Sequence, residues 1–281
     1  MIVVAQLGLR IITNYSGGND RVKIVFLDVG QGDAILIQYQ DSWFDAVQVL
    51  IDGGPDRSVL AGLGDYMPLF DRKIETVIAT HPDTDHIGGL VEVLRRYDVG
   101  SVIHNGQNAE SPAYKNFVLE AGSAEVIATD DQVSLVRVGE ETSVMFIPVP
   151  NNYADRNDNS VITRIDHGSF SVLLTGDASV EVEQYLIENY GPVIDVDVLK
   201  LGHHGSRTST SMKFLQATTP QQVVISAPVN GRYGHPHDEV IDNVVTYGRA
   251  KIFYTGEQGT IEFSPNQLGR GYQIVQQKTP N

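Results

Sequence analysis

The 281-residue sequence contains no cysteine, which excludes disulfide bonds and thiolate metal sites. Positive charge is also scarce: 20 Lys and Arg residues stand against 35 Asp and Glu residues, a formal net charge of −15 at pH 7. Because proteins that bind nucleic acid non-specifically present a basic field, the chain as a whole is not expected to bind DNA in that way. Bound metal ions would neutralise part of this acidity if several of the aspartates are ligands.

Long apolar runs are absent as well, since none approaches the ~20 residues that a transmembrane helix needs. The segment 1–18 is apolar, but Arg10 interrupts it and it lacks a basic start, so we predict a first strand and not a signal peptide. We therefore expect a cytoplasmic protein without a membrane partner. A hydrophobic content of 41% is ordinary for a globular protein of this size, which can bury a sizeable core.

Strand-like runs alternate with turns and a few helices in two β-rich halves of the chain. The runs 23–29, 33–39 and 48–54 predict an antiparallel meander. Further strands are predicted at 75–80, 133–138, 143–149, 160–165, 170–176, 195–201, 222–228, 251–256 and 260–264, and helices at 58–70, 87–97, 180–190, 209–218 and 237–247. Two sheets packed face to face with helices outside would give an α+β fold, a four-layer αββα sandwich. We predict one domain over residues 1–265, its halves joined by the loop 151–160, and an irregular tail over 266–281.

Four metal-binding side chains, His81, Asp83, Asp85 and His86, follow the predicted strand 75–80 within six positions. Alternate residues of an extended loop point the same way, so His81 and Asp83 can hold one ion while Asp85 and His86 turn toward a second. Imidazole and carboxylate ligands together suit Zn, Mn or Fe. The alternative is a polar turn capped by Asp, and four ligands in so short a stretch argue against it.

Two further sites follow strands of the second half. Asp177 could bridge two ions, although taken alone it is explained better as the N-cap of the next helix. His203 and His204 are adjacent, and an extended chain sends neighbouring side chains to opposite sides. One of the two is expected to bind metal and the other to act on the substrate as phosphate binder or proton donor, and the sequence leaves open which. A surface pair before a helix is the alternative.

A Gly- and Pro-rich loop carries His235, a candidate for stabilising an oxyanion or donating a proton, and Arg232, which could neutralise a phosphate. An exposed turn is the alternative there, and His237 is interpreted as a surface residue. Nearer the N-terminus, Asp33 and Asp52 lie beside Gly-rich turns, where they could support the metal-binding loops from behind.

Six motifs, DVGQGDAILIQ, VLIDGG, THPDTDHIGG, LLTGD, LKLGHHGS and NGRYGHPH, occur in this order. The set resembles the metallo-β-lactamase superfamily and is most similar to the C-terminal domain of the ComEC-type competence proteins. The Asp-substituted metal motif is also similar to that of bacterial phosphorylcholine esterases. The resemblance covers the chain from about residue 23 to about residue 260, one sandwich domain of ordinary length.

The resemblance implies a site for two divalent ions, Zn or Mn, at one edge of the sandwich. The ligands that it implies are His81 and Asp83 for the first ion, Asp85 and His86 for the second, Asp177 as the bridge, and either His203 or His204 to complete the second shell. Many relatives carry a third histidine before the Asp177 hairpin, where this chain reads NDNS. Asn159 would then be the replacement, or the first shell would stay open.

The function implied by these features is that of a metallo-hydrolase. We expect a phosphodiesterase or nuclease of the ComEC type, in which metal-bound hydroxide attacks phosphorus and His203, His204 or His235 protonates the leaving oxygen. DNA and RNA are the candidate substrates. The absence of cysteine and of a lipase-type serine motif argues against covalent catalysis. A small-molecule esterase or lactonase, and a degenerate metal-binding regulatory protein, are the alternatives.

Overall fold

The computed structural model describes residues 21–40, 46–122, 125–128, 134–138, 141–150, 152–266 and 269–277. The predicted first strand over 1–18 lies outside the described residues. Among the helices that the structure describes, none combines the length and the apolar character needed to cross a membrane.

Eight strands form the first sheet, in the order β15-β14-β1-β2-β3-β4-β5-β6. The strands β1, β2 and β3 make the predicted antiparallel meander, with Ile24 opposite Ile37 and Ile35 opposite Ile51, and β3 to β6 run parallel. Their bounds are Arg21–Phe26 (β1), Ile35–Gln40 (β2), Ala46–Ile51 (β3), Lys73–Ala79 (β4), Asp98–His104 (β5), Glu125–Ala128 (β6), Thr260–Pro265 (β14) and Tyr272–Gln277 (β15).

Seven strands form the second sheet, in the order β13-β12-β11-β10-β9-β8-β7. The pairs from β7 to β10 are antiparallel, and those from β10 to β13 are parallel. Their bounds are Ser134–Arg137 (β7), Thr142–Ile147 (β8), Ile162–His167 (β9), Phe170–Leu174 (β10), Val198–Lys200 (β11), Gln222–Ile225 (β12) and Lys251–Tyr254 (β13).

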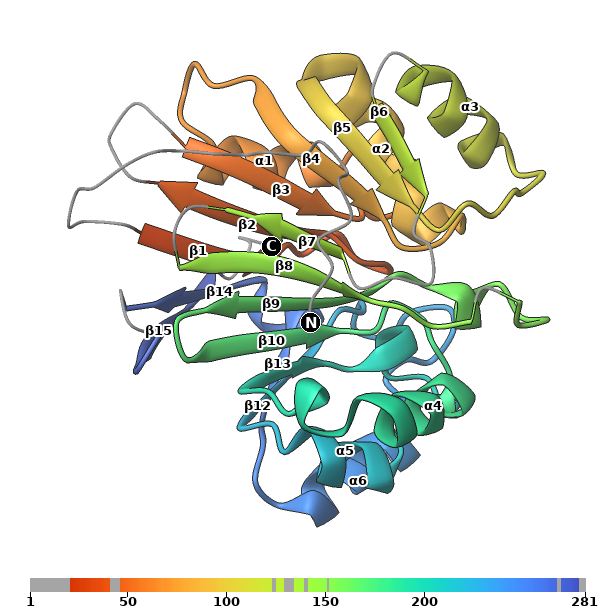
Figure 1. Cartoon of the computed structure of the whole chain (residues 1–281), viewed down its shortest axis with the longest axis vertical. Coiled ribbons are helices and arrows are strands. Elements are labelled where there is room, and N and C mark those ends of the chain that lie inside the picture. Colours follow the sequence, from red (N-terminus) through yellow and green to blue (C-terminus); the bar gives the residue numbers. More distant parts are fainter. Residues whose placement is uncertain are drawn as a thin grey trace.

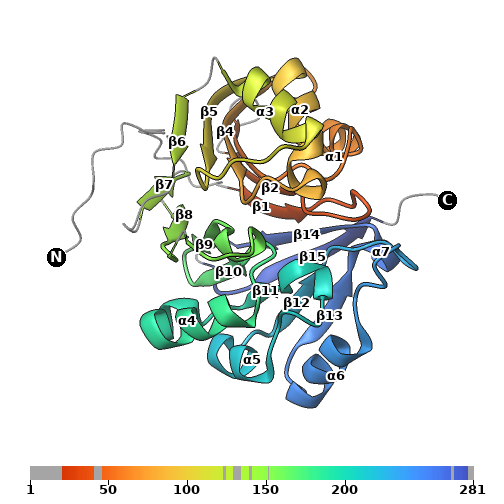
Figure 2. The same cartoon turned by 90° about the vertical axis from the view of Figure 1, so that its right-hand side faces the viewer.

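The two sheets face each other, and the helices cover their outer faces (Figures 1 and 2). One apolar cluster, including Phe26, Val172 and Phe263, fills the space between the sheets, and two more lie between each sheet and its helices. The helices are α1 (Val59–Tyr66), α2 (Thr84–Arg96) and α3 (Pro112–Ala121) on one side, α4 (Val180–Tyr190), α5 (Met212–Thr218) and α6 (Asp238–Tyr247) on the other, and the short α7 (Thr255–Gln258). The predicted αββα sandwich is confirmed.

Two parts of the fold differ from the prediction. The apolar pattern does not indicate β5, α3 and β6, although Ser111 caps α3 by accepting a hydrogen bond from the Tyr114 N–H, with Pro112 at the first helical position. The expectation of an irregular tail after Pro265 is wrong over β15, which pairs with β14 along its whole length. Backbone hydrogen bonds hold this Gln-rich edge strand, and its Tyr272 ring packs 4.8 Å from that of Phe170.

The topology brings several loops to one edge of the sandwich. Since β3 and β4 are parallel, the residues after them, Asp52 and Thr80, lie at the same end of the first sheet. The loops after β10, β11 and β12 share one end of the second sheet for the same reason. A backbone hydrogen bond of 3.0 Å from the Val161 N–H to the Thr80 carbonyl connects the two ends. The polar motifs are therefore gathered at one place.

Candidate metal centre

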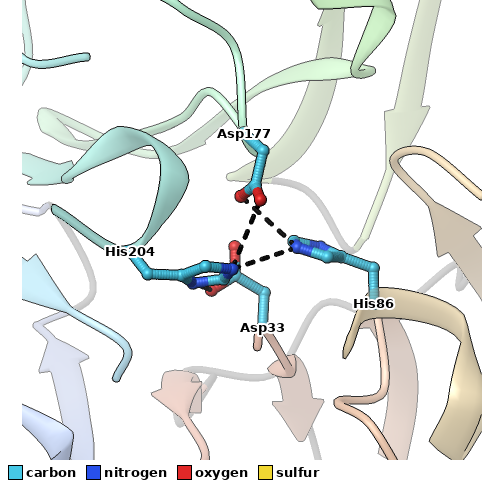
Figure 3. Close-up of side chains that lie close together, drawn as sticks. All are labelled: Asp33, His86, Asp177 and His204. Carbon is cyan, nitrogen blue, oxygen red and sulfur yellow. Dashed lines mark hydrogen bonds and ion pairs between the residues drawn. The ribbon is translucent and has the colours of Figure 1, made fainter. Parts of the chain in front are cut away.

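The Asp177 carboxylate is the point on which four histidines converge. The Nε2 atoms of His86 and His204 lie 3.3 Å from its oxygens, that of His203 lies at 3.7 Å and that of His81 at 3.9 Å. Figure 3 shows His86 and His204 pointing at Asp177 from opposite sides, with their own Nε2 atoms 3.3 Å apart. Asp177 itself is buried. Imidazoles from two chain segments, the loop and helix start after β4 and the 3₁₀ turn after β11, thus present the same nitrogen to one buried carboxylate.

Asp177 is not the helix N-cap that the sequence alone favoured. Ser179 caps α4, because its hydroxyl accepts a hydrogen bond from the Glu181 N–H. Gly176, with a φ of +53°, turns the chain sharply before Asp177, and a Cβ there would lie 2.8 Å from the Ser160 Cβ. The Asp177 side chain is left free of the helix and faces the histidines.

Each of the three most buried of these histidines has a polar neighbour at Nδ1. His86 Nδ1 donates to Asp52 at 2.7 Å, and Asp52 also accepts from the backbone N–H and hydroxyl of Thr80 at 2.8 and 2.7 Å. His81 Nδ1 lies 3.1 Å from the Thr80 hydroxyl, and His204 Nδ1 lies 3.5 Å from Asp33. Partners of this kind fix the ring orientation of metal-binding histidines and leave Nε2 for the ion.

The buried carboxylates of the cluster favour positive charge on the groups beside them. Burial by itself lowers the pKa of His204, but the Asp177 and Asp33 carboxylates raise it to about 10. Burial also lowers the pKa of His86, but the Asp177 and Asp52 carboxylates raise it well above its usual value. Burial, with the charge of His86, lowers the pKa of His81 to about 3, so this ring is neutral. A divalent cation would take the place of the protons on His86 and His204 and make both rings neutral ligands.

The donor set fits divalent metal ions. One ligand atom each from Asp33, His86, Asp177 and His204 lies within 4.8 Å of the others, and all four residues are buried. Within the described part of the chain, His81 Nε2 and one Asp177 oxygen are buried without a hydrogen-bond partner. Such atoms are costly unless something satisfies them. Imidazole and carboxylate donors suit Zn, Mn or Fe and do not single out one of them.

The two other aspartates of the motif lie differently. Asp85 is at the mouth of the cluster, with one oxygen 3.5 Å from His204 Nε2 and a side chain 29% exposed. The Asp83 carboxylate is instead paired with Arg156 at 2.9 Å. Among the predicted ligands, Asp83 is thus the one whose carboxylate pairs outside the histidine cluster.

Helix α2 packs closely against the loop after β3 because Gly89 has no side chain. A Cβ at Gly89 would lie 1.9 Å from the Gly53 carbonyl oxygen.

Asn159 does not replace the missing histidine. Its amide donates to the carbonyls of Tyr153 and Asp155 at 3.0 and 2.8 Å and accepts from the Tyr153 N–H at 3.0 Å, so its hydrogen bonds fold its own loop. The next residue, Ser160, lines the site with its hydroxyl 3.4 Å from His81 Nδ1. In this loop it is therefore the Ser160 hydroxyl, and not the Asn159 amide, that lies beside a histidine of the cluster.

The adjacent histidines point in different directions, although their backbone is not the extended chain predicted from the sequence. His203 and His204 are not extended; both have positive φ, 47° and 57°, inside the 3₁₀ turn Gly202–Gly205. Their rings are inclined by 73° to each other. His204 is buried in the cluster, whereas the His203 side chain is 27% exposed and its Nδ1 lies 3.1 Å from the Thr208 hydroxyl.

Of the last predicted residues, His235 lies beside the cluster, and Arg232 and His237 belong to the same loop. The His235 ring is 5.6 Å from that of His203 and 6.3 Å from that of His204, and burial with these neighbours lowers its pKa to about 4. Arg232 is exposed, with its guanidinium carbon 5.8 Å from the centre of the Tyr233 ring. His237, interpreted as a surface residue, is half-buried and accepts from a backbone N–H at 3.1 Å.

Sequence reasoning missed Lys200, which is fully buried with its Nζ 2.5 Å from Asp33. The available signal was a lysine inside the apolar run of residues 195–201. Arg156 and Ser160 were missed too, and nothing in their local sequence marks them. They are functional candidates only because the fold places them beside Asp83 and His81.

Comparison with known proteins agrees with this geometry. A family model described as "Metallo-beta-lactamase superfamily" matches residues 27–229. The chain belongs to this superfamily. It is 30% identical to ComE operon protein 3 of Bacillus subtilis, over 88% of this chain and 34% of that protein. It is 27% identical to competence protein ComA of Neisseria gonorrhoeae (87% and 32%) and 32% identical to recombination protein 2 of Haemophilus influenzae (80% and 26%). The resemblance to the competence proteins is confirmed, and the chain spans about a third or less of their length.

Among solved structures, this superfamily member is similar to CmlA, a diiron β-hydroxylase from Streptomyces venezuelae. The TM-score is 0.51 at 15% identity, and the match covers 85% of this chain and 53% of that one. At this identity the likeness shows a shared fold and leaves the reaction to be argued from the site.

Proposed function

We propose that this chain is a metal-dependent hydrolase of phosphodiesters. Members of the superfamily are generally hydrolases, and the chain holds a candidate metal site. The observation that carries the proposal is the convergence of four imidazole Nε2 atoms on the buried Asp177. Divalent ions bound there would acidify a water molecule and neutralise charge on the phosphate oxygens.

The residues of the chain divide this work. His81, His86 and His204 are buried, orient Nε2 toward Asp177, and are the side chains that we expect to hold the ions with Asp177 and Asp85. Asp52 and Asp33 keep His86 and His204 in position. We therefore assign metal binding to His204, and the choice between the adjacent histidines follows from its burial.

The substrate would approach from the side of His203 and His235. The two rings are partly exposed and lie 5.6 Å apart, and His203 Nε2 is 3.7 Å from the Asp177 carboxylate. In this position His203 can hydrogen-bond to the leaving oxygen and, when protonated to imidazolium, pass it a proton and return to the neutral ring; His235, neutral at pH 7, can donate a hydrogen bond to a phosphate oxygen. The weak acid–base groups thus face the substrate, and the ligands lie behind them.

Nucleic acid is the phosphodiester that we favour. Two of the relatives are named a competence protein and a recombination protein. The net charge of −15 opposes general binding to nucleic acid. Three exposed arginines supply local positive charge: Arg156 pairs with Asp83, and Arg207 and Arg232 lie three positions along the chain from His204 and His235. The acidic surface also favours the second candidate, a small-molecule esterase or lactonase.

The test begins with protein stripped by a chelator and reloaded with Mn or Zn. We expect turnover of bis-p-nitrophenyl phosphate and of labelled oligonucleotides, and a loss of more than ~100-fold in Asp177→Asn. Asp166→Asn is the matched control, because Asp166 pairs with Arg164 at the other end of the sheet. Hydrolysis of carboxylic esters or lactones but of no phosphodiester would favour the second candidate. Loaded protein that hydrolyses none of these substrates would contradict an enzymatic role.

A further inference from the structure

An exposed tyrosine continues the row of histidine rings out to solvent. Tyr233 is 57% exposed, and its ring lies 5.9 Å from that of His235 with 26° between the planes. The His235 ring is in turn 6.3 Å from that of His204, with 31° between the planes. Three rings with roughly similar tilt therefore lead from the buried cluster to the surface.

The loop that carries Tyr233 is tied to its surroundings. It follows β12, and the Tyr254 hydroxyl donates to the Pro228 carbonyl at 2.9 Å at its start. The His237 N–H donates to the Gly205 carbonyl at 2.9 Å at its end, beside the paired histidines. Inside the loop, the Gly234 N–H donates to the Gly231 carbonyl at 3.0 Å. The ring is thus held near the site by backbone contacts, with one face of the loop in water.

Exposure of a single tyrosine is ordinary and by itself indicates nothing. Two further features give this one a direction. It adjoins His235, which lies against the candidate ligands, and the Arg232 guanidinium carbon is 5.8 Å from the centre of its ring. An aromatic face with an adjacent cation is what proteins use to hold single-stranded nucleic acid, because every base offers a face and every link a phosphate.

We propose that Tyr233, flanked by Arg232, stacks on a base of a single-stranded nucleic acid whose phosphodiester lies at the Asp177 cluster. The inference rests on the proposed function and names the substrate class for that site. Arg232 would contact an adjoining phosphate. In a duplex the bases are already stacked on each other, so the platform favours single strands over double strands.

The test compares Tyr233→Ala with Tyr233→Trp in the metal-loaded protein. On a short single-stranded oligonucleotide, we expect Tyr233→Ala to raise KM by ~5- to 150-fold, the range that stacking on one aromatic ring supplies. Tyr233→Trp should keep KM near the wild-type value. Phe70→Ala is the matched control, since Phe70 is 91% exposed and lies before β4, at the end opposite the site.

A second readout is independent of turnover. An uncleavable phosphorothioate oligonucleotide carries 2-aminopurine at each position in turn, because the fluorescence of this base is quenched when it stacks. We expect protein-dependent quenching at one position with wild type and Tyr233→Trp and none with Tyr233→Ala. At that position, an abasic site should remove the KM difference between wild type and Tyr233→Ala.

The outcomes separate the inference from the proposed function. Equal KM effects on intact and abasic substrates, or quenching that survives in Tyr233→Ala, would overturn stacking while hydrolysis of bis-p-nitrophenyl phosphate still upheld the hydrolase. Protein that hydrolyses no phosphodiester would overturn the hydrolase. The thermal melt of Tyr233→Ala should match that of wild type, since the side chain is exposed, so misfolding is excluded as the cause.

Discussion

The buried ion pair behind His204 gives the sharpest quantitative prediction. Lys200 lies in β11 with no exposed surface, and its Nζ is 2.5 Å from Asp33, which is also buried. Burial raises the pKa of Asp33, but the charges of Lys200 and His204 lower it by more, so the carboxylate stays ionised in the fold. Removing the ammonium group takes away the nearer of the two positive partners of this buried charge and leaves only His204, at 3.5 Å.

Lys200→Met keeps the length of the side chain and removes its charge. Breaking a buried ion pair on one side costs ~3–5 kcal/mol, a large part of a total stability of ~5–15 kcal/mol. The double variant Lys200→Met/Asp33→Asn removes both charges and should recover more than half of the loss. The coupling energy between the two substitutions is therefore expected to exceed ~1.5 kcal/mol.

The assay is urea unfolding of the metal-free protein at pH 7, because bound metal would add its own stabilisation. Lys73→Met is the matched control, since Lys73 is 59% exposed in its side chain and pairs with Glu75 at the surface. The free energy of unfolding of Lys73→Met should fall by no more than ~1 kcal/mol. If Lys200→Met were as stable as Lys73→Met, or if the losses of Lys200→Met and Asp33→Asn simply added, the reasoning about this pair would be wrong.

Three more predictions concern the cluster and its surroundings. Elemental analysis after loading should find close to two divalent ions per wild-type chain and fewer in Asp177→Asn, and wild type that retains no metal would contradict the site. His204→Ala should weaken metal binding by at least ~10- to 100-fold, whereas His203→Ala should keep its metal and slow hydrolysis by ~10²- to 10⁴-fold; identical metal content and rates in the two variants would refute separate roles. Glu183→Ala removes the acceptor for two backbone N–H groups at the start of α5, one of them that of Ser211 at 2.9 Å. The free energy of unfolding should fall by ~1–3 kcal/mol, and an unchanged urea midpoint would disprove this prediction.

The sequence by itself determined the sandwich and most of the candidate ligands. Apolar alternation predicted the meander of β1 to β3, and the spacing of His81, Asp83, Asp85 and His86 after an apolar strand pointed to metal binding. These features are local, because side-chain direction along a strand or loop depends on a few successive residues. The same locality explains the failure at β15, where pairing with β14 and not the apolar pattern makes the strand.

Only the tertiary structure decided how the candidates are used. It paired Asp83 with Arg156, put Ser160 and not Asn159 beside His81, and placed Lys200 behind Asp33. The partners in each of these contacts are separated by more than 70 positions along the chain. No pattern of sequence spacing predicts a contact between residues so far apart in the chain. The contacts exist because the two sheets pack face to face and bring loops that are far apart in the sequence to one edge, where the histidines surround Asp177.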